Sequence, residues 1–309
     1  MTGATPLVSV GLAVRNGERH VAEAVRSVLN QDHARLELVI SDNASDDGTE
    51  EICCDLARAD ARVRYHRQPR DIGLVQNFEA VLRRARGAYF TWIGDDDGLA
   101  PGYVARCVEA LDEDRDLLLV TTEQAYVGSD GTVETAGSDV PALRSDRPVE
   151  RFAELLRLLN ESHLLLDPLY GMMRREPVAR LPRPVMVFED QVFAARLALA
   201  GRFGHVPEVL AYRRVKPFPR LPATARRLGV PAWRAHVATA LQCRELLVAV
   251  READLDPSER RRARAAVARL YLRRTRRTAA RRGRKLAGLA AHALARPPVP
   301  ASTAPPLSP

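Results

Sequence analysis

Short apolar runs alternate with longer segments of helical periodicity over the first 122 residues. The predicted strands are Val8–Val14, Leu36–Ser41, Val63–His66, Ala88–Ile93 and Leu117–Thr122. The predicted helices between them are Val21–Leu29, Thr49–Arg58, Val75–Ala85 and Pro101–Leu111. Because strands that alternate with helices favour a parallel arrangement, we predict an α/β fold. Its mostly parallel, Rossmann-like sheet is expected to carry helices on both faces.

The alternation weakens after residue 122, and the second part of the chain is expected to be more helical. A hairpin is predicted at Tyr126–Val133, and helices are predicted at Arg151–Leu159 and Glu189–Ala200, the latter closed by Gly201. The Pro- and Arg-rich stretch Lys216–Pro231 has the composition of a linker. Two more predicted helices follow, at Trp233–Val250 and Ser258–Arg277.

Charge divides the chain in the same way. The 309 residues carry a net charge of +8, but residues 215–309 hold 21 Lys and Arg against 5 Asp and Glu. The remaining 26 basic and 34 acidic residues give residues 1–214 a charge of −8. We therefore predict a globular domain at 1–214, made of the alternating half at 1–122 and a second half at 123–214. A basic helical extension at 215–296 and a disordered Pro-rich tail at 297–309 complete the predicted organisation.

The four cysteines show no metal-binding or disulfide pattern. No CxxC motif is present, and Cys53 and Cys54 are adjacent, so reduced and mostly buried thiols are expected. No run of about 18 apolar residues occurs, which excludes a membrane-spanning helix. The first residues lack a charged segment followed by an apolar one, so no signal peptide is predicted. A cytoplasmic location is the expectation.

Carboxylates follow two of the predicted strands at the point where each strand ends. Asp42 follows the second strand, and Asp95, Asp96 and Asp97 follow the fourth. Ligands of open α/β sheets bind beyond the carboxyl ends of strands. Three adjacent carboxylates repel one another, and one or two of them together with phosphate oxygens can hold Mg²⁺ or Mn²⁺. Taken alone, the triplet also fits a solvated turn whose aspartates cap a helix.

Six blocks in order give the chain a resemblance to family 2 glycosyltransferases with the GT-A fold. They are Val8–Asn16 with Ser27–Gln31, Leu36–Thr49, Asp71–Gly73 with Asn77-Phe78, Ala85–Asp97 with Pro101, Phe188–Gln191, and Val206–Arg214. The match spans residues 6 to about 214. The resemblance implies transfer of a sugar from a nucleotide-diphosphate donor to an acceptor.

The resemblance also assigns roles to individual residues. It implies that Asp42 contacts the nucleotide base, that Asp95 lies toward the ribose and that Asp96 binds the metal, with Asp97 as second ligand or acting through water. It implies that Asp190 is the catalytic base and that Glu189 orients it or touches the acceptor. It also makes residues 1–122 the nucleotide-binding half of the domain and residues 123–214 the acceptor half. The other residues that it places at the nucleotide sugar are Ala13, Arg15, Asn16, Asn77, Arg213 and Arg214.

The chemistry of sugar transfer needs the same groups. A divalent cation stabilises the diphosphate leaving group, and one carboxylate on the opposite face takes the proton of the acceptor hydroxyl. One base and one metal indicate a direct displacement with inversion. Taken alone, Glu189 and Asp190 also fit an acidic first turn favoured by the helix dipole.

The chain departs from the family pattern at a few positions. Ala13 and Arg15 stand where many members have Pro or Thr and an aromatic residue that stacks on the base, so Arg15 either replaces the stack by a cation–π contact or selects another nucleotide. Lys216 stands where relatives often have His; an exposed linker residue and a diphosphate contact are both open. His163 is expected to be structural. Arg213 and Arg214 can pair with the diphosphate.

The segment Glu259–Lys285 is rich in arginine. On a helix its apolar residues form a narrow stripe, made of Ala263, Val267, Leu270 and Tyr271. Such a helix suits an anionic membrane surface, which would be useful for a lipid-linked acceptor. Packing back on the acidic domain, or simple solvation, is an equal alternative. Nucleic acid is not expected, because aromatic residues are scarce here.

These observations predict a metal-dependent, inverting glycosyltransferase of the hexosyl- or deoxyhexosyl-transferase class. Its expected place is cell-envelope polysaccharide or secondary-metabolite biosynthesis. A nucleotidyltransferase is disfavoured, since Ala13–Arg19 is not a Gly-rich loop that ends in Arg or Lys. A non-catalytic sugar- or membrane-binding module on the same fold is the other alternative.

Overall fold

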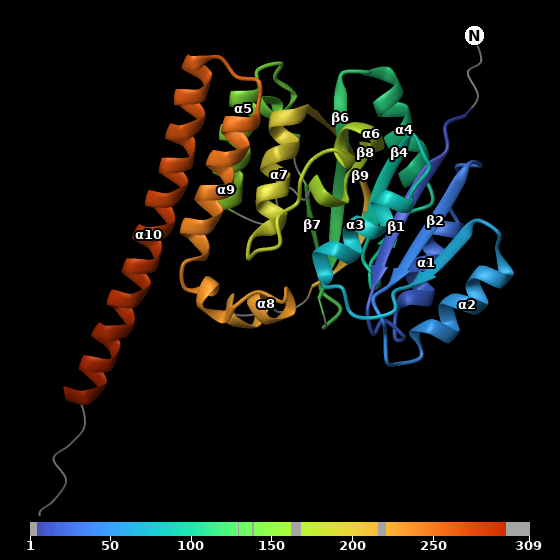
Figure 1. Ribbon diagram of the computed structural model, residues 1–309, viewed down its shortest axis with the longest axis horizontal. Coiled ribbons are helices and arrows are strands. Elements are labelled where there is room, and N and C mark those ends of the chain that lie inside the picture. The colour runs from blue at the N-terminus through green and yellow to red at the C-terminus, as the bar shows by residue number, and fades with distance from the viewer. Residues whose placement is uncertain (1–4, 129, 138, 162–167, 216–220, 295–309) are drawn as a thin grey trace, which may run out of the picture.

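The computed structural model describes residues 5–128, 130–137, 139–161, 168–215 and 221–294, with side chains up to residue 280 (Figure 1). Its strands are β1 (Val8–Val14), β2 (Leu36–Asp42), β3 (Val63–Arg67), β4 (Tyr89–Ile93), β5 (Gly98–Leu99), β6 (Leu117–Val127), β7 (Val133–Ala136), β8 (Met172–Arg174) and β9 (Arg202–Arg214). Its helices of seven or more residues are α1 (Val21–Leu29), α2 (Thr49–Ala59), α3 (Leu74–Arg84), α4 (Tyr103–Glu113), α5 (Pro148–Glu161), α7 (Glu189–Ala200), α8 (Leu221–Arg227), α9 (Ala238–Glu252) and α10 (Pro257–Leu294). Shorter helical segments are η1 (Pro141–Arg144), η2 (Pro168–Tyr170), α6 (Arg175–Ala179) and η3 (Ala232–Ala235).

One mixed sheet runs through the described part of the molecule, in the order β3-β2-β1-β4-β8-β6-β9-β5, with β7 paired to β6. The first four strands in that order are parallel, as the alternation of strands and helices predicts. Strand β8 then enters antiparallel between β4 and β6, and β5 pairs antiparallel with β9. The predicted hairpin is confirmed by the antiparallel pair β6 and β7.

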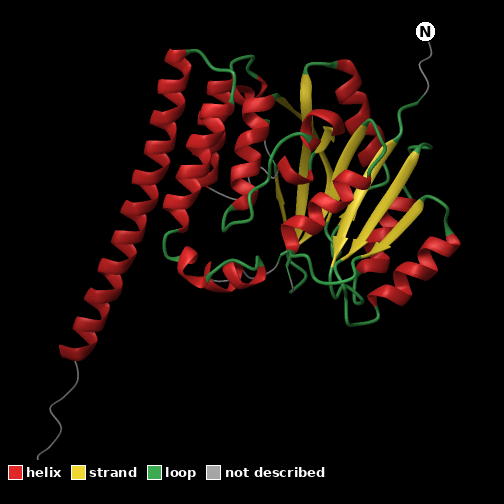
Figure 2. Cartoon of the chain, in the orientation of Figure 1, coloured by secondary structure: helices red, strands yellow, loops and turns green. Residues whose placement is uncertain are grey.

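Helices cover both faces of the sheet, which confirms the predicted layered α/β architecture (Figure 2). On one face α1, α2 and α4 pack against apolar side chains of β1, β2 and β4, such as Leu12 and Ile93. On the other face α3, α5 and α7 enclose Trp92 and Phe90 of β4. A strand with both faces covered has little exposed surface, and every residue of β1, β2 and β4 is buried.

The basic C-terminal segment belongs to the same hydrophobic core. Helices α9 and α10 lie beside α5 and α7 (Figure 1), and the cluster that contains Trp92 extends to Leu246 of α9 and Leu270 of α10. In the stripe predicted on α10, Ala263, Val267 and Leu270 are buried, whereas Tyr271 is 42% exposed. Packing against the acidic domain is therefore confirmed for this part of the helix. The division of the chain at Arg214 into a domain and an extension stays a prediction. Side chains from both sides of that division share one hydrophobic core.

The prediction of a linker at Lys216–Pro231 is wrong for the residues of this segment that the structure describes. Residues from Leu221 onward form α8, and Ala225, Leu228 and Val230 are buried in a small cluster with Val75 and Val187. The proline- and arginine-rich composition suggested an exposed segment, but these three apolar side chains pack against the domain. Helix α10 also runs further than predicted, to Leu294. The predictions for His163, Lys216 and the tail at 297–309 lie outside the described residues.

Two further expectations concern membrane-spanning helices and the cysteines. Within the described residues, no helix combines the length and the apolar character needed to cross a bilayer. Cys53, Cys54, Cys107 and Cys243 are all free thiols, and three of them are buried, as the sequence predicts.

Candidate functional site

The carboxyl ends of β1, β2 and β4 meet at one edge of the sheet. Val14 pairs with Asp42 in the parallel register of β1 and β2, and Leu12 pairs with Ile93 in that of β1 and β4. The loops that follow these strands therefore lie together, and a Cβ atom placed on Gly17 would come within 3.0 Å of the Asp95 carboxylate. The structure thus brings the two predicted carboxylate groups to the same edge.

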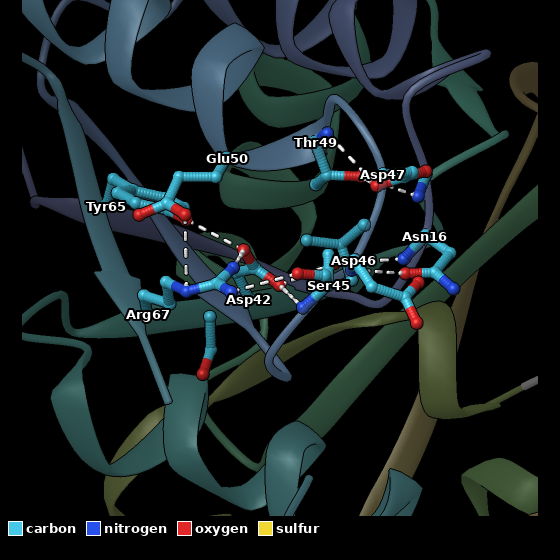
Figure 3. Close-up of polar contacts among 12 residues, drawn as sticks. Asn16, Asp42, Ser45, Asp46, Asp47, Thr49, Glu50, Tyr65 and Arg67 are labelled. Carbon is cyan, nitrogen blue, oxygen red and sulfur yellow. Dashed lines mark hydrogen bonds and ion pairs between the residues drawn. The ribbon is translucent and has the colours of Figure 1, made fainter. Parts of the chain in front are cut away.

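Asp42 is completely buried and already carries four hydrogen bonds (Figure 3). Its Oδ1 accepts from the backbone N–H of Ser45 at 2.9 Å and from the Ser45 hydroxyl at 2.6 Å. Its Oδ2 accepts from the Tyr65 hydroxyl at 2.7 Å and from Arg67 at 3.0 Å. Contact with a nucleotide base stays a prediction for this residue, and it would require Tyr65 or Arg67 to be displaced.

The loops after β1 and β2 hold each other in a strained conformation. Asn16 and Ala44 both have positive φ angles, 56° and 55°, although neither is glycine. The Asn16 amide donates to the Ser45 hydroxyl, and the Asp46 amide donates back to the Asn16 side chain (Figure 3). Each left-handed residue of this kind costs on the order of 1 kcal/mol or more, so the hydrogen bonds must offset that cost. Strain of this kind clusters at functional sites.

A polar chain leads from Arg15 to the start of α3. Arg15 pairs with Asp71, whose other carboxylate oxygen accepts from the Asn43 side chain at 2.6 Å and from the Gly73 amide at 2.8 Å. Both Arg15 and Asp71 keep more than 40% of their side chains exposed. Arg15 thus lies at the surface of this edge, where it can reach a ligand, and it is held there by a carboxylate.

The aspartates after β4 lie against the end of β9. The Asp97 carboxylate pairs with the Arg213 guanidinium, and both side chains are less than 10% exposed. The guanidinium carbon of Arg213 also lies 3.8 Å from the ring centre of Tyr170. Arg214 donates to the Asp96 carbonyl at 3.2 Å and pairs with Glu23 at 2.9 Å. Arg213 and Arg214 therefore lie against the aspartate cluster, each paired with a carboxylate, and their contact with a diphosphate stays a prediction.

The short strand β5 explains this arrangement. It pairs antiparallel with β9, Gly98 opposite Tyr212, and so carries the chain after Asp97 directly across the two arginines. Gly94 completes the turn, because a Cβ atom there would collide with the Asp97 carboxylate. A larger residue at this position would therefore displace the Asp97 side chain from its pairing with Arg213.

The donor set for a metal is partial. Within the described residues, no group of three or more His, Cys, Asp and Glu side chains is arranged to hold a metal ion. Mg²⁺ and Mn²⁺ in phosphate sites are commonly held by one or two carboxylates together with phosphate oxygens. Asp95 and Asp96 fit that donor chemistry, since both are half-buried at the strand end. Asp97 fits it less well, because its carboxylate is paired with Arg213.

The second predicted pair of carboxylates lies at the start of α7. Glu189 is 6% exposed, and both of its oxygens accept from Arg183, at 2.5 and 3.0 Å. The Arg183 guanidinium in turn lies over the rings of Phe78, Trp92 and Phe193. Burial raises the pKa of Glu189, although Arg183 opposes that effect. Glu189 is thus anchored in the core, which suits an orienting role better than contact with an acceptor.

Asp190 differs from its neighbour because it reaches solvent. The residue is exposed, yet desolvation by the surrounding protein raises the pKa of its carboxyl. The backbone N–H of Gln191 and the charges of Arg183 and Arg274 act in the opposite direction. Solvent access combined with a desolvated carboxyl is expected for a group in a recess, and a raised pKa suits a general base.

Other predicted residues play supporting parts. Asn77 is 2% exposed; its amide donates to the Ser41 carbonyl at 2.9 Å, and its side-chain oxygen accepts from the Ser41 hydroxyl. Ala13 is buried within β1. Sequence reasoning missed Tyr65, Asp71, Arg183 and Arg274. Two of these four residues left a signal, since Asp71 begins the block Asp71–Gly73 and Arg274 continues the stripe of Ala263, Val267 and Leu270 at helical spacing.

Curated relatives of this chain are named glycosyltransferases. The chain is 26% identical over 214 residues to glycosyltransferase EpsH of Bacillus subtilis (strain 168), across 64% of this chain and 57% of that protein. It is 30% identical over 188 residues to the teichuronic acid biosynthesis glycosyltransferase TuaG of the same organism, across 60% and 68%. It spans only 15% of the chondroitin synthase of Pasteurella multocida (strain Pm70), at 30% identity over 46% of this chain.

Solved structures show the same fold at low sequence identity. TarS 1-349 of S. aureus in complex with UDP-GlcNAc superimposes with a TM-score of 0.62 at 17% identity, over 86% of this chain and 72% of that one. The mannosyltransferase PcManGT of Pyrobaculum calidifontis, in complex with GDP-Man and Mn²⁺, gives a TM-score of 0.55 at 20% identity, over 94% and 81%. The GT-A fold expected from the sequence is therefore confirmed.

The family is established by the sequence match rather than by these superpositions. The model of glycosyl transferase family 2 matches residues 9–181, more than half of the chain, and this range includes Asp42, Asp96 and Asp97. Asp42, Asp96 and Asp97 of the carboxyl edge lie within that match, whereas the pair Glu189 and Asp190 at α7 lies beyond it. The chain is a member of glycosyl transferase family 2.

Proposed function

We propose that this protein transfers a sugar from a nucleotide-diphosphate donor to an acceptor hydroxyl. The observation that carries the proposal is a pair of carboxylate sites with opposite properties. At the carboxyl edge, the Asp96 carbonyl accepts from Arg214 and the neighbouring Asp97 pairs with Arg213, so two arginines lie at the aspartates, which suits a diphosphate. At α7, Asp190 is a single solvent-exposed carboxylate with a raised pKa, which suits proton transfer.

The residues divide the reaction between them. Arg213 and Arg214 hold the diphosphate by charge, and Arg15 and Asn16 lie where a nucleotide would rest against the ends of β1 and β2. Asp96, with Asp95, would hold Mg²⁺ or Mn²⁺, which when bound stabilises the negative charge of the leaving diphosphate. Asp190 takes the proton from the acceptor hydroxyl as that oxygen attacks. Glu189 fixes the start of α7 through Arg183 and so keeps Asp190 in place.

The stereochemical outcome follows from this division. One base and one metal site fit a single displacement, in which the acceptor oxygen attacks the anomeric carbon from the face opposite the diphosphate. The configuration at that carbon is then inverted. The names of the relatives favour cell-envelope polysaccharide as the product, with secondary metabolites as the alternative.

Donor turnover is the test of this proposal. The purified protein is incubated with a panel of UDP- and GDP-sugars, with Mn²⁺ or with EDTA, while thermal shift and nucleotide release are measured. We expect at least one donor to raise the melting temperature with Mn²⁺ and to be hydrolysed slowly without acceptor. Failure of every donor to bind or be hydrolysed would contradict the proposal and favour a non-catalytic module.

We also propose that α10 keeps the enzyme at the inner face of an anionic membrane. The support is a surface of this helix on which Tyr271 and Leu272 are 42% and 51% exposed beside the exposed Arg273 and Arg276. Apolar insertion and charge attraction add on such a surface.

The test of membrane binding uses a point substitution. Deletion of α10 would also disturb the hydrophobic core that this helix shares. Leu272→Ser should reduce sedimentation with anionic vesicles and leave that with neutral vesicles unchanged; equal sedimentation with anionic vesicles would exclude the idea.

A further inference from the structure

Arg274 of α10 reaches into the start of α7 from the far end of the chain. Its guanidinium donates to the side-chain oxygens of Gln191 at 2.8 Å, of Gln242 and, at 3.4 Å, of Asn160. Gln242 is fully buried and donates to Gln191 at 2.9 Å. Three helices, α5, α7 and α9, thus supply the partners of one arginine of α10.

The contacts of Arg274 lie on both sides of Asp190. The guanidinium carbon lies 5.0 Å from the ring centre of Phe188, and one nitrogen bonds Gln191. Phe188 has a φ of 68°, a left-handed conformation that is unfavourable for a bulky residue. Arg274 therefore holds the residue before the acidic pair and the residue after it, and it keeps the strained entry into α7 in one conformation.

The partners of Arg274 leave its charge uncompensated. Gln191, Gln242 and Asn160 are neutral amides, so they satisfy hydrogen bonds without cancelling the positive charge. Burial lowers the pKa of Arg274, and the Asp190 charge opposes that effect. In such surroundings a nearby carboxylate experiences most of the field of the guanidinium. Asp190 is that carboxylate, and the field favours its ionised form.

Other charged groups also act on Asp190. Arg183 lowers the pKa of Asp190 more than Arg274 does, but its guanidinium is paired with Glu189 on both oxygens. Glu189 adjoins Asp190 in the chain and accepts both of these hydrogen bonds. From α9, Cys243 faces Arg274 as a neutral thiol, since burial raises its pKa. Two arginines thus act on Asp190 by their charge. Arg183 is bonded to a carboxylate, whereas Arg274 is bonded to neutral amides.

We propose that Arg274 is a positioning residue for catalysis, which fixes the turn around Asp190 and keeps this carboxylate ionised when the acceptor arrives. The inference rests on the proposed role of Asp190 as base. It also makes α10 a part of the active centre, although this helix lies beyond the residues that the family model matches.

The test compares Arg274→Gln, which removes the charge, with Arg274→Lys, which keeps it. Arg264→Gln is the matched control, because it removes an exposed charge from the same helix. We measure the pH profile of kcat, the donor KM and the circular dichroism of each variant. Arg274→Gln should lose about 10- to 100-fold in kcat with little change in donor KM, and the acidic limb of its profile should move to higher pH. Arg274→Lys should restore the limb, and Arg264→Gln should match the parent.

A second measurement separates this inference from the proposed reaction. The titration of the Asp190 carboxyl carbon is followed by ¹³C NMR without substrate, with Asp190→Asn for assignment. A higher midpoint in Arg274→Gln supports the inference even if no donor is ever turned over. An unchanged midpoint, or a kcat loss that is equal at every pH, overturns it. If Arg274→Gln does not fold, Arg274→Lys takes its place. A lower kcat in Arg274→Lys, with an unmoved midpoint of the Asp190 titration, supports the positioning role. A parent-like kcat in Arg274→Lys overturns it.

Discussion

At the ends of β1 and β2, polar side chains find their partners within the first 77 residues, whereas Asp190 lies among side chains of α5, α7, α9 and α10. Asp42 bonds Ser45, Tyr65 and Arg67, all on β2, β3 or the loop between β2 and α2. Asp190, in contrast, experiences the charge of Arg274, which bonds its neighbour Gln191 across 83 residues. In the proposed reaction, the part of the donor side at the ends of β1 and β2 is thus built by a compact stretch of chain, to which β9 adds Arg213 and Arg214. The proposed acceptor side is built by helices that meet only in the folded protein.

The difference teaches where each function is vulnerable. A change on the donor side is expected to act on nucleotide binding or on the stability of the first strands. A change on the acceptor side is expected to act on the chemical step and to leave the donor bound. The following predictions test that separation, from the largest expected effect to the smallest.

Asp190→Asn should abolish most transfer while the donor stays bound. The substitution removes the proton acceptor and keeps the shape of the side chain, so kcat should fall by about 10² to 10⁴. Donor affinity, measured by calorimetry with Mn²⁺, should stay within about twofold of the parent. Asp55→Asn on α2, 65% exposed, is the control. A comparable loss of donor affinity in Asp190→Asn would break the separation between the two sides.

Asp96→Asn should give the opposite result. The loss of one carboxylate from a two-carboxylate set should weaken Mn²⁺-dependent donor binding by at least about tenfold, because the amide carries no charge. Treating the parent with EDTA should lower donor affinity to the same level. If Asp96→Asn bound the donor as the parent does and EDTA still weakened the parent, the metal would be held elsewhere.

Glu37→Gln should affect stability alone. Glu37 of β2 is 7% exposed and accepts from Ser9 at 2.6 Å, from the Arg86 amide at 2.6 Å and from Arg64 at 2.8 Å. Loss of the charge should lower the free energy of unfolding by about 1 to 3 kcal/mol at neutral pH. Donor KM and kcat should be unchanged, since this group joins β1, β2 and the loop before β4 away from their carboxyl ends.

The pH dependence of that effect has a definite sign. Burial raises the pKa of Glu37, but the three hydrogen bonds and the charge of Arg64 outweigh it, so the pKa lies below its usual 4.5. The stabilisation is therefore complete above the unfolded-state pKa and is lost as pH falls through the folded-state value. Urea unfolding should separate parent and variant at neutral pH and bring them together in acid. A gap that stays constant in acid would show that packing, and not charge, is responsible.

The strands and the donor-side residues could be predicted because their signals are local. The bounds of β1, α1 and α7 agree with the predicted ranges residue for residue, since apolar periodicity and capping are set by neighbours in the sequence. Asp42 and the three aspartates at 95–97 were placed correctly at the carboxyl edge, because parallel strands bring their ends to the same side. The segment at 221–231 was misjudged, since its apolar residues are too sparse to reveal the face that packs.

By itself, then, the sequence determined the first four strands and the helices between them, the edge at which Asp42 and the aspartates at 95–97 gather, and the family. The pairing of Asp97 with Arg213, of Glu189 with Arg183 and of Gln191 with Arg274 was decided only by the tertiary structure. The physical reason is that a side chain's intrinsic preference extends over a few neighbours, whereas burial and charge depend on whatever the fold brings within a few ångströms. An arginine-rich helix with a net positive charge thereby became, at one position, a neighbour of the candidate catalytic base.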